Sequence, residues 1–281
     1  MNCVIEQTSL KLFKNHLIIE EKSAFTVENY VRSISKFIVW LCAQTVDKAL
    51  VLRYKEHLAK TCKLTTANCA ISALNSFFDF LGAPHLKVKT FKIQREIFYS
   101  DDKELTKAEY NRLLKCAKAK KNRRLFYLMQ TICACGIRVS ELKFITADAV
   151  LKKRAAVMCK GKCRTVILPD KLCRILTRYM KEKGIKSGCV FVTRSGKPLN
   201  RSNIWREMNK LCKAAGVKKT KVFPHNLRHL FARTYYTYEK DIVRLADILG
   251  HSSINTPRIY TMESGSIHRE HIQKLGLILT T

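Results

Sequence analysis

FPHNLRH at residues 223–229, LGHSS at residues 249–253 and TPRIY at residues 256–260 form the stretch that decides the fold. His225 and Arg228 are three residues apart, so on a helix the two side chains share one face. An ordinary amphipathic helical pattern separates the first motif from the second. The stretch therefore predicts helices that carry histidine, arginine and tyrosine near their ends.

Two helix boundaries place the remaining polar side chains of this stretch. Gly250 predicts a helix end, which puts His251 at the start of the next turn. Thr256 followed by Pro257 predicts an N-cap and the first helical residue, so Tyr260 falls in the first or second turn of a new helix. Three helix ends can therefore direct four side chains into one pocket: His225, Arg228, His251 and Tyr260.

These side chains suit an anionic substrate. An arginine stays charged and its fork matches two phosphate oxygens, while a histidine can donate a hydrogen bond to a third. A tyrosine phenol can act as a covalent nucleophile when nearby groups support its negative charge. No acidic metal-binding cluster occurs in residues 223–260. The combination favours phosphoryl chemistry carried out by protein cations, with no metal and no cofactor.

Two further motifs precede this stretch. CGIRVSEL at residues 135–142 contains Arg138 and Glu141, and KGKCRTV at residues 160–166 contains Lys160. With the later histidine, arginine and tyrosine motifs, they resemble the tyrosine recombinase (phage integrase-like) family, especially its compact Xer-type branch. The motifs occur in the order that the family shows, and the resemblance covers the larger, C-terminal part of the chain.

The resemblance implies a specific reaction on DNA. The Tyr260 phenol would attack a phosphodiester, forming a 3′-phosphotyrosyl link and releasing a 5′-hydroxyl. A second 5′-hydroxyl would then attack that link, so that strands are exchanged without ATP. Arg138 and Arg228 are the expected clamps, because negative charge accumulates on the non-bridging oxygens in the transition state. Lys160 is the expected general acid for the departing oxygen, with the neighbouring cations of the same hairpin as alternatives.

The resemblance also implies supporting roles around these residues. His225 and His251 are expected to hydrogen-bond phosphate oxygens, and either can assist proton transfer from the tyrosine. Glu141 is expected to orient Arg138, the alternative being a plain ion pair on a helix surface. His229 is expected to pack beside the second arginine. The residues expected to contact the DNA backbone are Lys162, Arg164, Lys87, Lys89, Lys92 and Arg95.

The chain carries far more positive than negative charge. Its 281 residues contain 53 Lys and Arg against 22 Asp and Glu, a formal net charge of +31. The excess is spread along the chain, which favours a basic surface that holds a polyanion. Double-stranded DNA is the leading partner, and an anionic membrane is disfavoured because no basic amphipathic anchor stands out. With no apolar span and no signal-peptide pattern, a cytoplasmic location is expected.

Twelve cysteines raise the question of a disulfide or zinc framework. The spacings of Cys133 and Cys135, and of Cys159 and Cys163, lack the paired C-x-x-C pattern of a zinc site. Several cysteines lie within apolar helical patterns, where a thiol behaves as a small buried hydrophobe. We therefore expect structural, reduced thiols and no metal site. These cysteines are Cys42, Cys69, Cys133, Cys173 and Cys212.

The sequence divides into two domains and a linker. Residues 1–86 contain four apolar helical patterns with interspersed lysines, a bundle that the resemblance equates with a core-binding (SAM-like) DNA-binding domain. Residues 87–104 are basic without a helical stripe, and predict either an extended linker along a phosphate backbone or a solvated connector. A capping box at residues 106–109 opens the catalytic domain, residues 105–281.

The catalytic domain is expected to be mainly helical with a small β-sheet, which makes the whole chain α+β. Residues 155–158 and 164–168 predict two strands that flank a Lys-Gly-Lys turn, and residues 189–193 predict a third short strand. Helices are expected over residues 201–215 and from His225 onward.

Three functions fit these features. The first is a site-specific DNA recombinase that works as a homotetramer or mixed tetramer, integrating or excising a mobile element or resolving DNA dimers. A helix predicted over residues 267–279 would exchange into a neighbouring protomer, as in the resembling family, or pack on its own domain. A catalytically inactive DNA-binding regulator is disfavoured, because every expected site residue is present. A type IB topoisomerase is disfavoured by the small bundle and the lack of a long coiled-coil insertion.

Overall fold

The computed structural model describes residues 7–42, 44–93, 103–159, 162–193, 195–250 and 274. The chain forms two compact units, Met1–Arg95 and Glu96–Thr281, and the boundary lies within the segment predicted as a linker. Most described residues are helical and the one small sheet has two strands, so the α+β prediction is confirmed. No helix in the described ranges is both long and apolar enough to cross a bilayer.

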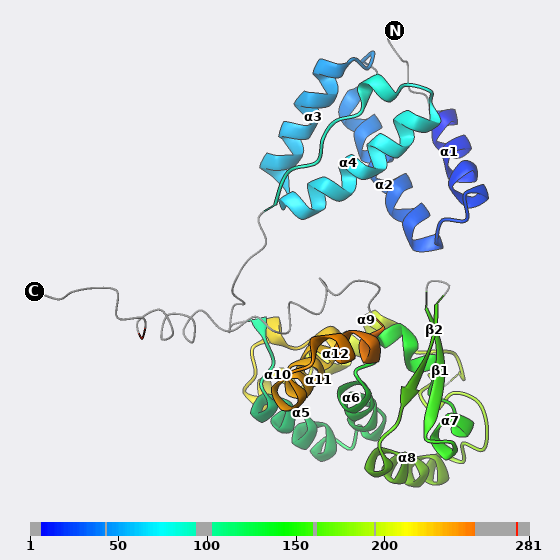
Figure 1. The fold of residues 1–281 in the computed structure, drawn as a ribbon, viewed down its shortest axis with the longest axis vertical. Coiled ribbons are helices and arrows are strands. Elements are labelled where there is room, and N and C mark those ends of the chain that lie inside the picture. The colour runs from blue at the N-terminus through cyan, green and yellow to red at the C-terminus, as the bar shows by residue number, and fades with distance from the viewer. Residues whose placement is uncertain are drawn as a thin grey trace, which may run out of the picture. The chain divides into compact units, whose positions relative to one another are not determined.

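The first unit is a bundle of helices around an aromatic core (Figure 1). Phe13, Phe37 and Phe77 recur on the inner faces of three of its helices and are each 0% exposed. Ser23 and Asp47 cap two helices by accepting backbone N–H groups, as short polar side chains at this position do. The elements are α1 (Gln7–Ile19), α2 (Ala24–Leu41), α3 (Lys48–Thr61), α4 (Leu64–Phe80) and the 3₁₀ turn η1 (Pro84–Leu86).

Two asparagines fasten the chain after η1 along α4. Asn75 accepts from the Val88 N–H at 3.0 Å and donates to the Val88 carbonyl at 2.8 Å. Asn68 likewise accepts from the Phe91 N–H at 2.8 Å and donates to the Phe91 carbonyl at 2.9 Å. The asparagines are two helical turns apart and so lie on one face of α4. Residues 87–93, part of the predicted linker, are therefore an extended strap on the first unit, which Figure 1 shows running beside α4.

The second unit is built around α6 (Arg123–Cys135), which packs against helices from four other parts of the unit. Leu128, Met129 and Ile132 of α6 are almost completely buried. The other elements are α5 (Lys107–Ala119), η3 (Val139–Phe144), α7 (Ala147–Leu151), β1 (Arg154–Cys159), β2 (Lys162–Ile167), α8 (Asp170–Lys183), α9 (Arg201–Asn209), α10 (Cys212–Ala215), η4 (Lys219–Lys221), α11 (Pro224–Glu239) and α12 (Ile242–Leu249).

The predicted hairpin and the predicted capping box at residues 106–109 are confirmed. Strands β1 and β2 pair antiparallel from Arg154 opposite Ile167 to Cys159 opposite Lys162. Figure 1 shows this hairpin beside α7 at one side of the unit. Thr106 and Glu109 form the predicted capping box at the start of α5, with each side chain bonded to the other's backbone N–H.

The predicted third strand at residues 189–193 is wrong. This segment makes only single bridges, Thr146 with Cys189 and Val192 with Pro198, and no ladder. Its apolar side chains Val190 and Phe191 are 1% exposed because they pack into the core. A short apolar run predicts that the segment is buried, but a buried segment forms a strand only when another strand pairs with it.

The helix predicted over residues 201–215 is two helices, α9 and α10, with a break at Lys210 and Leu211. No glycine or proline marks that break in the sequence.

The predicted burial of the cysteines holds only in part. Cys42 and Cys69 are exposed, whereas Cys173 and Cys212 are buried as predicted. Cys42 follows α2 in a left-handed conformation, φ 47°, and so leaves the helical pattern that suggested burial.

Candidate active site

A buried carboxylate gathers the arginines that the sequence singles out. Glu141 lies in η3 and is 1% exposed. Its Oε1 accepts from Nη1 of Arg138 at 2.9 Å, and its Oε2 accepts from the Arg138 backbone N–H at 2.8 Å. The same Oε2 accepts from Nη2 of Arg164 at 2.8 Å and lies 4.0 Å from Nη1 of Arg228. We call these four residues the arginine cluster.

Arg228 ties two helix ends together inside this cluster. Its side chain is 1% exposed. Its Nη1 donates to the Gly136 carbonyl at the end of α6, and its Nη2 donates to the Leu249 carbonyl at the end of α12, each at 2.7 Å. Because the last carbonyls of a helix lack partners within the helix, a buried guanidinium satisfies them well. Arg228 therefore fixes where α12 ends and where the chain toward His251 begins.

Arg164 is also turned inward, on strand β2. It is 15% exposed, and its Nη1 donates to the Ile248 carbonyl of α12 at 2.5 Å. Sequence reasoning placed this side chain on DNA and missed its contact with Glu141. Strand alternation could have shown it, because Arg164 lies two and four residues before the buried Val166 and Leu168, on the same face of the strand.

The cluster leaves positive charge open toward solvent. Three guanidinium groups surround one carboxylate, so the charges do not cancel. Arg138 is 30% exposed, and its Nη2 approaches the Gly250 carbonyl at 3.4 Å. A partly exposed guanidinium held from below by a carboxylate can receive an anion without reorganising.

His225 stands at the start of α11, close to these charges. Loss of part of its water shell, followed by the charges of Arg228, Arg201 and Arg138, lowers the pKa of the His225 imidazole below its ordinary value of 6.5. Its ring lies 4.5 Å from that of His229, edge to face, one helical turn away. His225 is exposed and His229 is partly buried. Arg201 is a neighbour that sequence spacing did not reveal.

Several predicted residues lie outside the described part of the chain. These are Lys160, His251, Tyr260 and Arg95, and of Lys162 only the backbone is described. The predicted boundaries at Thr256 and Pro257 and the helix at residues 267–279 are outside it as well. Among the other predicted DNA contacts, Lys89 and Lys92 are exposed on the strap along α4, and Lys87 pairs with Asp79 at 2.8 Å.

Replacing Gly250 tests the fit between α12 and Arg164. Gly250 has φ +64°, and a Cβ there would lie 2.4 Å from Cδ and 2.7 Å from Nε of Arg164. Gly250→Ala should therefore add a steric clash to a backbone cost of about 1–2 kcal/mol. Gly184→Ala is the matched control, since Gly184 has φ +66° and a Cβ there would meet nothing within 4 Å. We expect a lower Tm for Gly250→Ala than for Gly184→Ala; equal values would contradict the fit.

The electrostatics of His225 predict its titration. A lowered pKa means that the folded chain binds the proton less readily than the unfolded chain. His225 should therefore be neutral at pH 7, and it should reduce stability as pH falls through 6.5, where the unfolded chain gains a proton first. An NMR titration should give a midpoint below 6.5, raised by Arg201→Gln and unmoved by Arg174→Gln, since Arg174 is not among the charges that act on His225. A midpoint above 6.5 would mean that partial burial and the neighbouring arginines do not lower the pKa of His225.

Comparison with known proteins places the chain in a family. The phage integrase family matches residues 103–265, and the phage integrase N-terminal SAM-like domain matches residues 10–84. A tyrosine recombinase of Pseudothermotoga lettingae is 30% identical, over 89% of this chain and 92% of its own. Tyrosine recombinase XerA of Thermococcus kodakarensis is 29% identical, over 97% and 94%.

Solved structures share the fold. A XerH site-specific recombinase bound to its difH substrate superposes with a TM-score of 0.70 at 20% identity, over 92% of this chain and 82% of its own. A lambda integrase dimer bound to a COC′ core site gives 0.73 at 17% identity, over 92% and 77%. The chain belongs to the phage integrase family. Within that family it is a tyrosine recombinase, an enzyme of site-specific DNA recombination.

Proposed function

We propose that this recombinase cleaves duplex DNA through Tyr260 and rejoins it to a second duplex. The phenolic oxygen attacks a backbone phosphorus, its proton passes to a neighbouring base, and the bond from phosphorus to the 5′-oxygen breaks. The product is a 3′-phosphotyrosyl ester and a 5′-hydroxyl. Attack by the 5′-hydroxyl of the partner strand reverses the chemistry, so the phosphodiester count is conserved and no ATP is consumed.

The arginine cluster is the observation that carries this proposal. Arg138 presents its guanidinium at the surface, fixed by Glu141, at the end of the helix that leads to His251. A phosphate seated there would meet preformed positive charge as its non-bridging oxygens become more negative. We assign Lys160 to protonation of the departing 5′-oxygen, and His225 and His251 to hydrogen bonds with the phosphate.

The two inward arginines have a different task in this proposal. The described partners of Arg228 and Arg164 are Glu141 and carbonyl groups at the ends of α6 and α12. We therefore assign Arg164 a positioning role in place of the DNA contact that its sequence position suggested. It connects the hairpin next to Lys160 with the helix end next to His251, so that both sides of the phosphate are held in register. The charge of Arg228 still supports the anion from below.

Assembly and biological setting extend the same proposal. Two duplexes must be cut and exchanged, which calls for four active sites, so we propose a homotetramer or mixed tetramer on paired DNA sites. A C-terminal helix at residues 267–279 that exchanges between protomers would hold it together. Integration of a mobile element and resolution of DNA dimers are both compatible with this chemistry. A cytoplasmic location stays a prediction.

A strand-exchange assay tests the function. Footprinting on the DNA flanking the gene identifies the recognised site, and two duplexes of different length carrying that site are then mixed with the protein. We expect hybrid products in which flanks are exchanged, formed with EDTA present and without ATP. Relaxation of supercoils without exchange would favour a topoisomerase, and binding without cleavage would favour an inactive regulator. Either result would contradict the proposal.

The charge of the chain predicts a steep dependence of DNA binding on salt. Each phosphate neutralised by Lys or Arg adds about −0.9 to the slope of log affinity against log salt concentration. With a net charge of +31 we expect a slope well beyond that of a single contact. Fluorescence anisotropy over a salt series measures it. A flat response would rule out a protein that grips the DNA backbone.

A further inference from the structure

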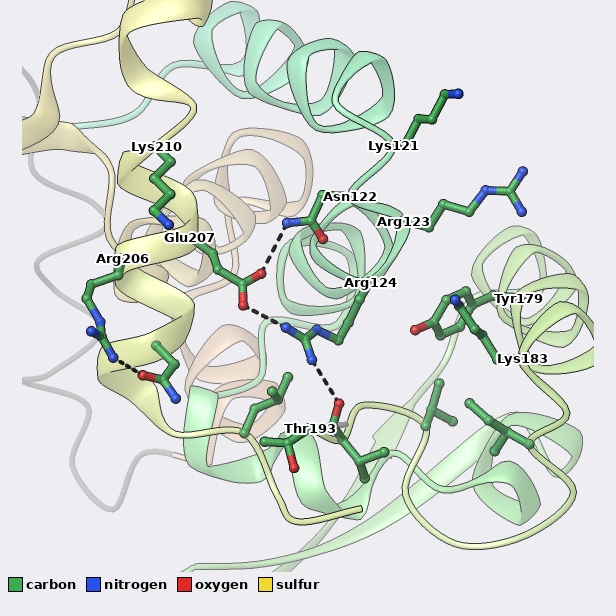
Figure 2. A pocket seen from close by; sticks show the side chains of 15 residues that line it. Lys121, Asn122, Arg123, Arg124, Tyr179, Lys183, Thr193, Arg206, Glu207 and Lys210 are labelled. Atoms are coloured by element: carbon green, nitrogen blue, oxygen red, sulfur yellow. Dashed lines mark hydrogen bonds and ion pairs between the residues drawn. The ribbon is translucent and has the colours of Figure 1, made fainter. Parts of the chain in front are cut away.

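A groove on the second unit gathers cations away from the arginine cluster. It has a volume of about 1070 Å³ and lies between the start of α6, the end of α8, residues 185–193 with Leu199, and α9. Figure 2 shows cations on both sides of the groove, with Arg124 between them. We call it the basic groove, after Lys121, Arg123, Arg124, Lys183, Arg206 and Lys210.

A fixed polar network forms the base of the groove. Arg124 pairs with Glu207 at 2.6 Å and donates to the Val192 carbonyl at 3.1 Å. Asn122, the N-cap of α6, donates to the other oxygen of Glu207 at 3.2 Å. These contacts, drawn as dashed lines in Figure 2, fasten α9 to α6. Glu207 is the only acid among the described lining residues, and Arg124 already balances it.

The rim of the groove therefore keeps its positive charge. Arg123 pairs with Glu182, but Lys121, Lys183 and Lys210 have no acidic partner within the described ranges. The chain is densely basic here, because KAKKNRR at residues 118–124 places five cations in seven residues. Short basic runs of this density are typical of contacts with nucleic acid. None of these lysines is used by the arginine cluster.

We propose that the basic groove is a second DNA-contact site, which holds the sugar-phosphate backbone of the duplex beyond the point of cleavage. The groove begins at the first turn of α6 and the arginine cluster follows its last turn. The 13 residues of α6 span about 20 Å at 1.5 Å per residue. No residue of α6 after Arg123 is exposed, so the duplex would bend around the unit to reach the groove, over at least about six base pairs. The inference rests on the proposed cleavage at the cluster, which brings the duplex to this unit.

The lining favours the backbone of a duplex over other anions. Sites for single strands or nucleotides offer exposed aromatic rings on which bases stack. Tyr179, the aromatic residue of this groove, is 3% exposed and packs against Phe191 and Tyr127. An acidic protein segment would also satisfy the charge. DNA held at the cluster has a far higher effective concentration at the groove than a free partner, which favours DNA.

Lysine footprinting tests the groove in the unmodified, full-length protein. Acetylation rates are read by mass spectrometry with and without a long duplex, and with a duplex trimmed to the immediate cleavage region. We expect the long duplex alone to slow acetylation of Lys121, Lys183 and Lys210 several-fold. Exposed lysines elsewhere on the unit, Lys115 and Lys213, should change little. Equal protection of all these lysines would overturn the proposal.

A matched pair of triple variants gives the second readout. Lys121→Gln, Lys183→Gln and Lys210→Gln together should reduce the salt slope of binding to the long duplex by up to about 2.7, at 0.9 per lost contact. Lys115→Gln, Lys171→Gln and Lys213→Gln remove the same charge from exposed positions outside the groove and should leave the slope nearly unchanged.

The cleavage rate of bound DNA separates this inference from the proposed function. The groove variant should cleave saturating DNA at the unmodified rate, because its lysines do not touch the reacting phosphate. If the unmodified protein cleaves no DNA, the proposed function fails whatever the footprint shows. If cleavage is normal but both triple variants have equal slopes, the groove is not a DNA site, and an acidic protein segment becomes the occupant to seek.

Discussion

Arg138→Lys should slow DNA cleavage by about a hundredfold or more, the usual cost of losing one preorganised transition-state donor. Lysine keeps the charge but not the planar fork, so it cannot bond Glu141 and a phosphate together. Arg138 is 30% exposed, so the substitution should alter Tm little. Single-turnover cleavage of a saturating duplex measures the effect on chemistry apart from binding.

The same substitution at a surface arginine provides the control. Arg244 is 63% exposed and pairs loosely with Glu239 at 3.6 Å, so Arg244→Lys should cleave at the unmodified rate. If Arg138→Lys cleaves as fast as Arg244→Lys, the bidentate role of Arg138 is wrong. If it weakens binding but not the rate at saturation, Arg138 positions the ground state only.

Glu141→Gln should lower the free energy of unfolding far more than the loss of an exposed carboxylate. Glu141 accepts from two arginines and lies 4.0 Å from a third, all close to the core. Breaking a buried ion pair from one side typically costs about 3–5 kcal/mol, because the remaining charge stays buried without compensation. We expect a corresponding fall in the free energy of unfolding of the second unit, measured by urea denaturation. Cleavage should also fall, since Arg138 loses its support.

Asp148→Asn makes the same chemical change at an exposed ion pair. Asp148 and Lys152 are 69% and 61% exposed, and such pairs contribute little to stability. The contrast therefore isolates burial from the loss of a carboxylate. Glu141→Gln with the stability of Asp148→Asn would mean that Glu141 is not the centre of the cluster.

Local sequence signals predicted the elements that depend on neighbours in the chain. The capping box at Thr106 and the helix end at Gly250 each follow from a residue's preference for one backbone conformation. The pairing of Arg138 with Glu141 was also accessible, because the residues are three apart.

Local sequence signals could not predict contacts between residues that are far apart in the chain. Arg164 reaches Glu141 from a different strand, and Arg228 reaches the carbonyls of two helices far from it in sequence. Helical spacing cannot reveal such pairs, because packing decides them. Packing also decides the segment at residues 189–193, whose apolar side chains are buried although no strand pairs with it in a ladder.

The central claim is that Tyr260 becomes joined to cleaved DNA beside the arginine cluster. The most direct measurement uses a nicked duplex that traps the intermediate, because the fragment carrying the free 5′-hydroxyl diffuses away. Protein and DNA are separated under denaturing conditions, and the attached residue is identified by mass spectrometry. We predict a 3′-phosphotyrosyl link on Tyr260, absent in Tyr260→Phe. A link to any other residue, or an adduct that persists in Tyr260→Phe, would contradict the account.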